Sequence, residues 1–247
     1  MWLYLKKKYF KGIFLFHKYF TRTARPLKGF YGVFLNPVYT DKTFEYCFKG
    51  TYGTILSQWL ANEVEDMIFL DIGANQGLYA VLAGKNPAFK KVFAFEPNKK
   101  LIPYLSKNLK MNGVVSYQVI QAAISNQSGE RTLHISEGHS GKSTLRSTKS
   151  SIQETVRIVT MDHAELNRMI PSDLINGIKI DVEGHEEIVI GELVKCAFFQ
   201  HTKWIYCEID EKWIRPENIF ELLRKEGFRS FNKIGNHPTH YDVLMQR

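Results

Sequence analysis

The sequence of 247 residues has few cysteines, no long hydrophobic run and no acidic residue near its start. Its three cysteines (Cys47, Cys196 and Cys207) form neither an even disulfide set nor a CxxC metal motif, so a reducing cytoplasm is the simplest interpretation. The longest N-terminal apolar runs, Trp2–Leu5 and Ile13–Phe16, have four residues each. A transmembrane helix needs roughly 20, and these runs are also too short for a secretory signal. We therefore expect no membrane-spanning segment.

Acidic residues are absent from residues 1–40, which carry eight basic side chains. Of the 33 basic residues, the remaining 25 equal the 25 acidic residues, the first of which is Asp41. The body of the chain is therefore electrically balanced, which excludes a uniformly basic nucleic-acid binder. We predict two regions, a basic aromatic N-terminal arm (residues 1–40) and a single domain (residues 41–247).

Short apolar runs rich in Val, Ile and Phe alternate with helical patterns from residue 54 onward. Continuous apolar strands separated by helices are typical of a parallel sheet covered on both faces, so we predict a doubly wound, mostly parallel α/β fold. The predicted strands are Met67–Asp71, Lys91–Glu96, Tyr117–Ile124, Gly177–Val182 and Trp204–Ile209, with Phe228–Phe231 and Tyr241–Met245 as a closing pair. In residues 129–161 the succession of strands and helices is interrupted by two segments in which apolar and polar residues alternate, which indicates an inserted β-hairpin.

A glycine-containing loop, residues 71–77 (DIGANQG), follows the first predicted strand. Asn75 stands where a dinucleotide-binding loop needs its second glycine, so a pyrophosphate ligand is disfavoured. Glu96 ends the second strand, 19 residues after Gly77, where a carboxylate can accept hydrogen bonds from both hydroxyls of a ribose. Together these features suit a nucleoside with an amino-acid tail. The alternative is a loop that merely turns the chain.

Four motifs in this order resemble the FkbM family of S-adenosylmethionine-dependent methyltransferases: DIGANQGLYA (Asp71–Ala80), AFEPN (Ala94–Asn98), AAIS (Ala122–Ser125) and IKIDVEGHE (Ile178–Glu186). The resemblance covers roughly residues 50–210. It implies a class I methyltransferase fold, S-adenosylmethionine as cofactor and methylation of hydroxyl groups, often on sugars. It further implies that Glu96 holds the ribose, that Ala123 lies near the adenine, and that the methionine end is lined by Asp71, Gly73, Ala74, Asn75 and Gly77.

Acidic residues and a histidine crowd the end of the fourth predicted strand. Methylation of an alcohol needs a base for the hydroxyl proton. His185 has the ordinary pKa best suited to that task, and we expect neighbouring carboxylates to raise its basicity. Asp181 could orient the histidine or act itself, and Glu183 is a further catalytic candidate. Both Glu183 and Glu186 could instead cap the following helix, which we favour for Glu186.

Two other groups allow alternative interpretations. Asp181 with Glu208 or Asp210 could hold Mg²⁺ through carboxylate oxygens, but the ligand set is incomplete and we assign no metal site. The segment Gly138–Thr144 (GHSGKST) lacks the first glycine of a phosphate-binding loop. It is either a polar loop over the active site, with His139 and Lys142 touching substrate, or a plain solvated loop.

The arm has an apolar stripe at helical spacing (Trp2, Leu5, Tyr9, Ile13, Phe16 and Phe20), with lysines broadly opposite. One interpretation is peripheral contact of residues 1–28 with an anionic membrane at the inner face. The other is packing on the domain as a lid or dimer contact, and RNA binding is the least favoured.

We thus expect an O-methyltransferase acting on a carbohydrate or glycoconjugate. The alternatives are a small natural product or lipid as acceptor, or a non-catalytic cofactor-binding module recruited to membranes.

Overall fold

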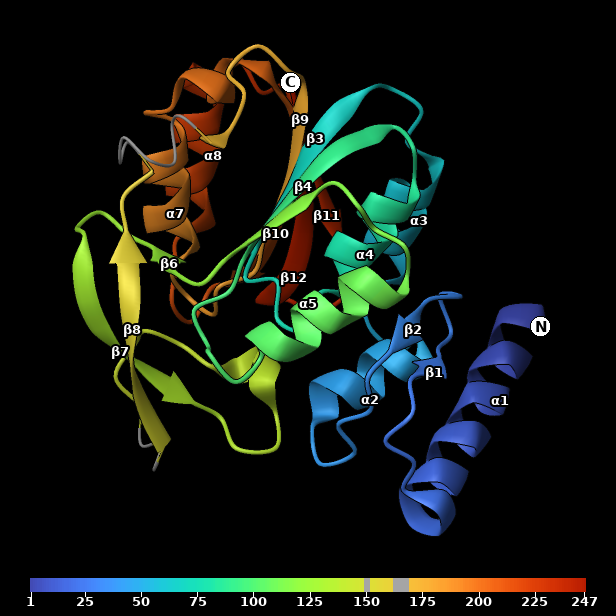
Figure 1. The fold of residues 1–247 in the computed structure, drawn as a ribbon. Coiled ribbons are helices and arrows are strands. Elements are labelled where there is room, and N and C mark those ends of the chain that lie inside the picture. The colour runs from blue at the N-terminus through green and yellow to red at the C-terminus, as the bar shows by residue number, and fades with distance from the viewer. Residues whose placement is uncertain (149–151, 162–168) are drawn as a thin grey trace.

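A seven-stranded sheet forms the centre of the computed structural model, which describes residues 1–148, 152–161 and 169–247 (Figure 1). In their order across the sheet, the strands are β11 (Ser230–Ile234), β12 (His240–Gln246), β10 (Thr202–Asp210), β9 (Asn176–Ile180), β3 (Met67–Ile72), β4 (Phe89–Phe95) and β5 (Tyr117–Ile120). Neighbouring strands from β10 to β5 are parallel, whereas β12 is antiparallel to both of its neighbours. The predicted doubly wound, mostly parallel sheet and its closing strand pair are confirmed.

Apolar side chains of the sheet divide between two cores on its opposite faces. In β3, Ile68, Leu70 and Ile72 belong to one core, while Met67 and Phe69 belong to the other. This is why a strand that is buried throughout has an unbroken apolar sequence. The first core is covered by α7 (Glu186–Leu193) and α8 (Pro216–Lys225), and the second by α2 (Lys42–Lys49), α3 (Thr54–Asn62), α4 (Leu78–Lys85) and α5 (Ile102–Met111) (Figure 1).

The third predicted strand is wrong in its extent. It ends at Ile120, where the Ala122 N–H donates to the Ile120 carbonyl and turns the chain away. After this turn, Ala123 and Ile124 form a separate strand, β6 (Ala123–Ile124), which pairs in parallel with β8 (Ile152–Val159). A continuous apolar run therefore serves two different sheets. Elsewhere, η3 (Ala197–His201) leads into β10 and adds Phe198 and Phe199 to the first core.

The predicted β-hairpin insertion is confirmed, although residues 149–151 of it lie outside the described residues. β7 (Gly129–Ile135) pairs antiparallel with β8, and with β6 they form a second, three-stranded sheet. Leu133, Ile135, Val156 and Ile158 form its small core. The connection from β7 contains the short turn η2 (Ser140–Lys142), which the insertion places near the central sheet.

The N-terminal residues form α1 (Trp2–Phe16) and a π-helical turn, η1 (His17–Thr21), followed by the short strands β1 (Leu27–Lys28) and β2 (Phe34–Leu35). α1 lies beside α2 at the edge of the molecule (Figure 1). The Phe14 ring is 6.1 Å from that of Phe44 and 6.2 Å from that of Phe48, between ring centres, and Phe14 is 1% exposed. No helix among the described residues has both the length and the apolar character to cross a bilayer.

The face by which α1 packs is not the apolar stripe that its spacing predicts. The contact is made by Phe10, Ile13 and Phe14, and two of these fall outside the predicted stripe. The other five residues of that stripe, Trp2, Leu5, Tyr9, Phe16 and Phe20, are exposed. Helical spacing shows which side chains share a face, but the aromatic cluster on α2 decides which face is covered.

Replacement of Phe14 by alanine tests how firmly α1 is docked. A buried Phe→Ala change removes apolar contacts and leaves a cavity, so we expect the free energy of unfolding to fall by about 3–5 kcal/mol. Phe16→Ala is the matched control, because Phe16 lies on the same helix and is 53% exposed. Urea unfolding followed by circular dichroism measures both variants. Equal stability of the two variants would contradict the docked arrangement.

Candidate active site

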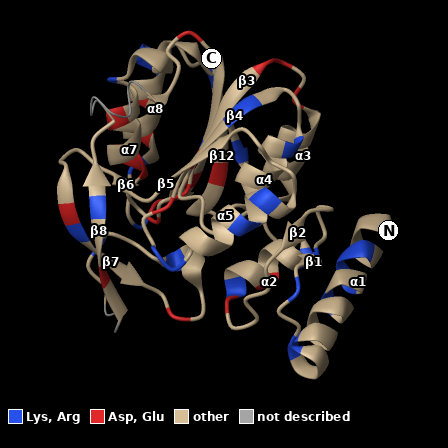
Figure 2. Cartoon of the chain, viewed as in Figure 1, with Lys and Arg blue, Asp and Glu red and all other residues tan. Residues whose placement is uncertain are grey.

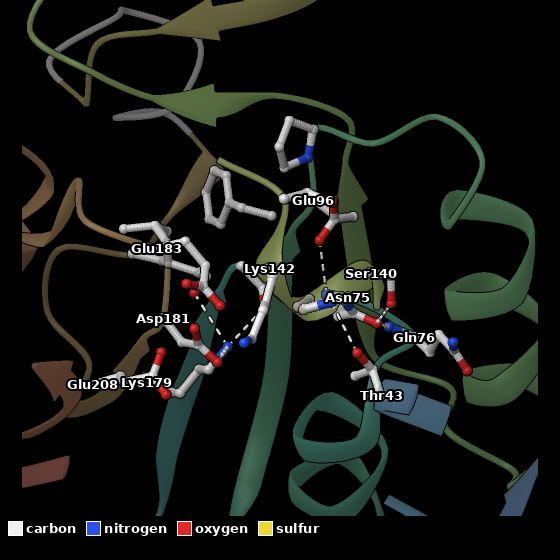
Figure 3. A pocket seen from close by; sticks show the side chains of 18 of the residues that line it. Thr43, Asn75, Gln76, Glu96, Ser140, Lys142, Lys179, Asp181, Glu183 and Glu208 are labelled. Atoms are coloured by element: carbon white, nitrogen blue, oxygen red, sulfur yellow. Dashed lines mark hydrogen bonds and ion pairs between the residues drawn. The ribbon is translucent and has the colours of Figure 1, made fainter. Parts of the chain in front are cut away.

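A cavity of about 340 Å³ lies at the carboxyl ends of the central parallel strands. Its wall includes the glycine loop after β3, the end of β4, the β6 segment and the turn η2 (Figure 3). This is the edge at which open α/β sheets bind ligands. Of the sequence-predicted cofactor residues, the cavity is lined by Gly73, Ala74, Asn75, Glu96 and Ala123.

The glycine loop adopts backbone conformations that side chains rarely tolerate. Gly73 and Gly77 have φ angles of +79° and +82°, and Asn75 has a φ of 51°. A Cβ at Gly73 would overlap the Asp181 carbonyl oxygen, and one at Gly77 would overlap the Leu105 side chain. The two glycines therefore let the loop lie directly against β9 and α5. Gly77 acts through this packing and does not line the cavity.

Glu96 joins the end of β4 to the glycine loop. Its carboxylate accepts the backbone N–H of Asn75 through Oε2 and that of Asn98 through Oε1, each at 2.8 Å. Burial raises the pKa of Glu96 to about 7, against the opposing effect of these two N–H donors. The side chain lies in the cavity wall beside Asn75 (Figure 3).

A buried lysine that the sequence analysis missed holds the strand ends together. Lys179 Nζ donates to the Gly73 carbonyl at 2.6 Å and lies 3.4 Å from Asp71 Oδ1 and 3.6 Å from Asp181 Oδ2. Burial acts to lower the pKa of Lys179, but the two carboxylates outweigh it and the pKa is raised. Asp71 is fully buried, accepts the Ala80 N–H at 3.0 Å and does not line the cavity. It therefore supports the loop from beneath.

Three carboxylates form an acidic cluster on the opposite wall, and Figure 3 shows them close together. Oxygens of Asp181, Glu183 and Glu208 lie within 4.8 Å of one another. Burial, and then the Asp181 charge, raises the pKa of Glu183 to about 8 and that of Glu208 well above its usual value. The Tyr52 hydroxyl donates to Asp181 Oδ2 at 2.9 Å.

The acidic cluster contains two of the three carboxylates that the sequence offers as possible Mg²⁺ ligands. Carboxylate oxygens are the ligands that Mg²⁺ prefers, and Asp181 and Glu208 are both in the cluster. Asp210 is not part of it, and its Oδ1 accepts the Lys212 N–H in the turn after β10. The Lys179 ammonium already pairs with Asp181.

The expectation that neighbouring carboxylates raise the basicity of His185 is wrong. Burial, and then the charges of Arg131 and Arg146, lowers its pKa to about 4. His185 Nε2 is 3.0 Å from the Ser125 hydroxyl oxygen, although the residue also lines the cavity. Glu186 has a structural role, because its Oε1 accepts the backbone N–H groups of Val182 and Gly184 at 3.1 Å.

The turn η2 closes the cavity from the side of the inserted sheet. Asp41, at the N-cap of α2, accepts hydrogen bonds from the Ser140 N–H and hydroxyl and from Gln76 Nε2. One buried carboxylate thus ties the inserted sheet to the glycine loop. His139 and Lys142 line the cavity, which supports a loop over the active site rather than a plain solvated loop.

Comparison with known proteins agrees with this geometry. A family model described as the methyltransferase FkbM domain matches residues 71–230. The chain belongs to this family. It is therefore a methyltransferase that depends on S-adenosylmethionine, as the motif resemblance implies.

Two curated relatives of this FkbM methyltransferase also have methyltransferase names. Methyltransferase sdnD of Sordaria araneosa is 28% identical over 205 aligned positions, and the match covers 68% of this chain and 76% of that protein. Hexuronic acid methyltransferase AglP of Haloferax volcanii is 27% identical over 160 residues, or 64% of this chain. The match spans 62% of AglP, less than two thirds of its length.

Two solved structures are similar to this chain at low sequence identity. Precorrin-6y C5,15-methyltransferase from Geobacter metallireducens has a TM-score of 0.45 and 13% identity, covering 78% of this chain and 87% of that chain. Trm5b from Pyrococcus abyssi has a TM-score of 0.47 and 18% identity, covering 87% of this chain and 52% of that chain.

The residues of the methyltransferase site that sequence reasoning missed are Lys179, Tyr52 and Asp41. Lys179 had a signal, because it stands two positions before Asp181 on a strand, where alternate side chains share a face. Tyr52 and Asp41 had none, since both lie far from the motifs in sequence and reach the site through α2 and its neighbours.

Replacement of Lys179 by methionine would leave the buried Asp71 carboxylate of the methyltransferase without its cation. We expect the free energy of unfolding to fall by about 3–5 kcal/mol, as when one partner of a buried ion pair is removed. The double variant with Asp71→Asn should regain part of that loss, because the unpaired charge is gone. Chemical denaturation of the single and double variants measures this coupling. A single variant within 0.5 kcal/mol of the parent, about the usual surface effect, would contradict it.

Proposed function

We propose that this methyltransferase transfers a methyl group to a hydroxyl group of a carbohydrate or glycoconjugate. The observation that carries the proposal is the acidic cluster of Asp181, Glu183 and Glu208 beside the glycine-loop cavity. Carboxylates can orient a sugar hydroxyl by hydrogen bonds and accept its proton as the oxygen is methylated. The name of one relative, a hexuronic acid methyltransferase, supports a sugar acid among the acceptors.

The cavity suits S-adenosylmethionine in size and in chemistry. Its volume of about 340 Å³ lies in the range of roughly 300–1,000 Å³ that is usual for ligand sites. The carboxylates in its wall suit a ligand that carries a sulfonium and an ammonium group. When bound, S-adenosylmethionine supplies an electrophilic methyl group.

Each predicted cofactor residue has a place in this proposal. Glu96, at the end of β4, accepts hydrogen bonds from the ribose hydroxyls, and Ala123 forms the wall beside the adenine. Gly73, Ala74 and Asn75 present loop backbone to the methionine end. Asp71 and Gly77 act indirectly, Asp71 through Lys179 and Gly77 through the packing of the loop.

The geometry favours Asp181 over His185 as the group that takes the hydroxyl proton. Asp181 lines the cavity, and the Tyr52 hydroxyl and the Lys179 ammonium hold its carboxylate in place. His185 Nε2 is already paired with the Ser125 hydroxyl at 3.0 Å, and the charges of Arg131 and Arg146 disfavour the imidazolium that proton uptake would form. Glu183, with its pKa raised to about 8, is protonated at pH 7 and can donate a hydrogen bond to the acceptor.

The role of Glu96 is tested by isothermal titration calorimetry with S-adenosylmethionine. We expect Glu96→Gln to weaken binding by at least roughly tenfold, since each hydrogen bond to a charged group contributes about 1.5–3 kcal/mol. Parent affinity should also fall as the pH drops below about 7, because the raised pKa of Glu96 means that its carboxylate becomes protonated there. Glu130→Gln, on the exposed part of β7, is the matched control. Unchanged affinity in Glu96→Gln would remove this residue from the cofactor site.

The choice of base is tested by comparing Asp181→Asn with His185→Asn. General base catalysis contributes about 10²–10⁴-fold, so we expect kcat of Asp181→Asn, measured at saturating S-adenosylmethionine, to fall by that factor. His185→Asn should retain most of the turnover. Asp210→Asn, at the end of β10 and outside the acidic cluster, is the matched control. The opposite ranking of the two variants would assign the base to His185.

The acceptor class is tested with labelled S-adenosylmethionine and a panel of acceptors. We expect label to transfer to oligosaccharides that contain uronic acids. Transfer only to lipids or small non-carbohydrate alcohols would contradict the carbohydrate proposal while preserving the methyltransferase. No transfer at all, with cofactor binding intact, would favour a non-catalytic binding module.

A further inference from the structure

The outer side of α1 has a large apolar surface that the rest of the described chain leaves uncovered. The inward residues Phe10, Ile13 and Phe14 pack on the domain. Trp2, Leu3 and Tyr9 line a groove between α1 and the domain, beside Thr54 and Ser57. The other large apolar side chains of α1 and η1 lie outside both contacts, with exposed fractions from 39% to 80%: Tyr4, Leu5, Leu15, Phe16, Tyr19 and Phe20. Contiguous exposed apolar patches of this kind mark interaction sites.

Lysines run along this same helix beside the exposed aromatic rings. Lys7, Lys11 and Lys18 recur at helical spacing, so they lie along one side of α1 and of the turn that continues it. Lys8 Nζ lies 4.5 Å from the centre of the exposed Tyr4 ring. Lys6 instead faces the domain, where its Nζ lies 4.4 Å from the centre of the Phe30 ring. Figure 2 shows blue bands along α1 and no red, as expected for a segment without an acidic residue. The surface is therefore both apolar and uniformly positive.

We propose that the outer side of α1 and η1 is a docking surface for an anionic lipid membrane. The exposed aromatic and leucine side chains enter the interface between headgroups and acyl chains, while the lysines pair with lipid phosphates. At 15 residues, α1 is about 22 Å long and lies in the plane of the interface.

The positive charge and the apolar side chains of this surface favour an anionic membrane over a second copy of the chain and over RNA. A second copy of the chain would bring a second set of lysines against the first, and the like charges would repel. An RNA phosphate backbone would pair with the lysines but would leave the exposed Leu5 and Leu15 without an apolar partner. A membrane with anionic headgroups satisfies both kinds of side chain.

The contacts of α1 would give the docked enzyme a defined orientation. Phe14 packs on Phe44 and Phe48 of α2, and Asp41 at the N-cap of α2 holds both η2 and the glycine loop. The membrane surface is thereby connected to the cavity wall through buried contacts of a single helix. This placement of the enzyme is independent of the identity of the methyl acceptor.

Vesicle co-sedimentation with the full-length chain tests the proposal. We expect binding to phosphatidylcholine vesicles that contain phosphatidylglycerol, little binding to phosphatidylcholine alone, and weaker binding as salt is raised. The variant Lys7→Gln/Lys8→Gln/Lys11→Gln should bind on the order of a hundredfold more weakly, since each lysine near the headgroups contributes about fivefold. Lys100→Gln/Lys225→Gln/Lys233→Gln removes the same charge from the domain, and its binding should match the parent's.

A second variant separates apolar insertion from electrostatic attraction. Leu5→Ala/Phe16→Ala/Phe20→Ala retains every lysine and should still lose roughly tenfold or more in vesicle binding. These residues are exposed, so circular dichroism and methyl transfer to a free acceptor should match the parent.

Three results would overturn the proposal: no binding of the parent to anionic vesicles, equal loss in the domain-lysine control, or retained binding in both α1 variants. Size-exclusion chromatography and an RNA gel shift complete the test. A dimer or an RNA complex that the α1 substitutions abolish, together with absent vesicle binding, would assign the surface to that partner instead.

Discussion

The site depends on one buried ammonium group. Lys179 rises from β9 and reaches the carbonyl of Gly73 and the carboxylates of Asp71 and Asp181. It thereby joins two neighbouring strands and the glycine loop at a single point with 3% exposure. A buried cation is costly unless its surroundings supply negative charge and acceptors. Here two strand ends and a loop supply them, so the three segments must come together in one arrangement.

The charge of Lys179 also organises the electrostatics of the cavity. Its ammonium partly offsets the acidic cluster, in which burial and mutual repulsion raise the pKa values of Glu183 and Glu208. Asp181 lies between the cation and these carboxylates, and the Tyr52 hydroxyl fixes its position. Asp181 is thus fixed by a hydrogen bond and an ion pair, whereas the raised pKa values of Glu183 and Glu208 favour their protonated forms. Such a separation of roles among like residues is typical of sites that move protons.

A second carboxylate, Asp41, performs the corresponding task on the other wall. It caps α2 through the Thr43 N–H and accepts hydrogen bonds from Ser140 and Gln76. One side chain therefore connects the inserted sheet, the glycine loop and α2, the helix on which α1 packs. Asp41 is also the first acidic residue of the chain. The charge boundary seen in the sequence is thus the point at which the basic arm joins the site.

Local sequence patterns and motifs determine the strands of the central sheet, the glycine loop and the family of this protein. Unbroken apolar runs such as Met67–Asp71 predict strands buried on both faces, and they lie at the predicted places. The glycine positions follow from backbone conformations that a side chain would strain, and Glu96 lies at its strand end as expected. Family membership follows from these motifs because they encode the loop and its contacts directly.

Tertiary structure alone decided how distant side chains meet. The run Tyr117–Ile124 divides between two sheets because β8 offers Ala123 and Ile124 a pairing partner. His185 has a pKa near 4 rather than a raised one because folding buries it near Arg131 and Arg146. α1 docks by Phe10 and Phe14 because the aromatic rings of α2 lie on that side. Burial, charge neighbours and the choice of packing face depend on residues far apart in the chain, so no local pattern contains them.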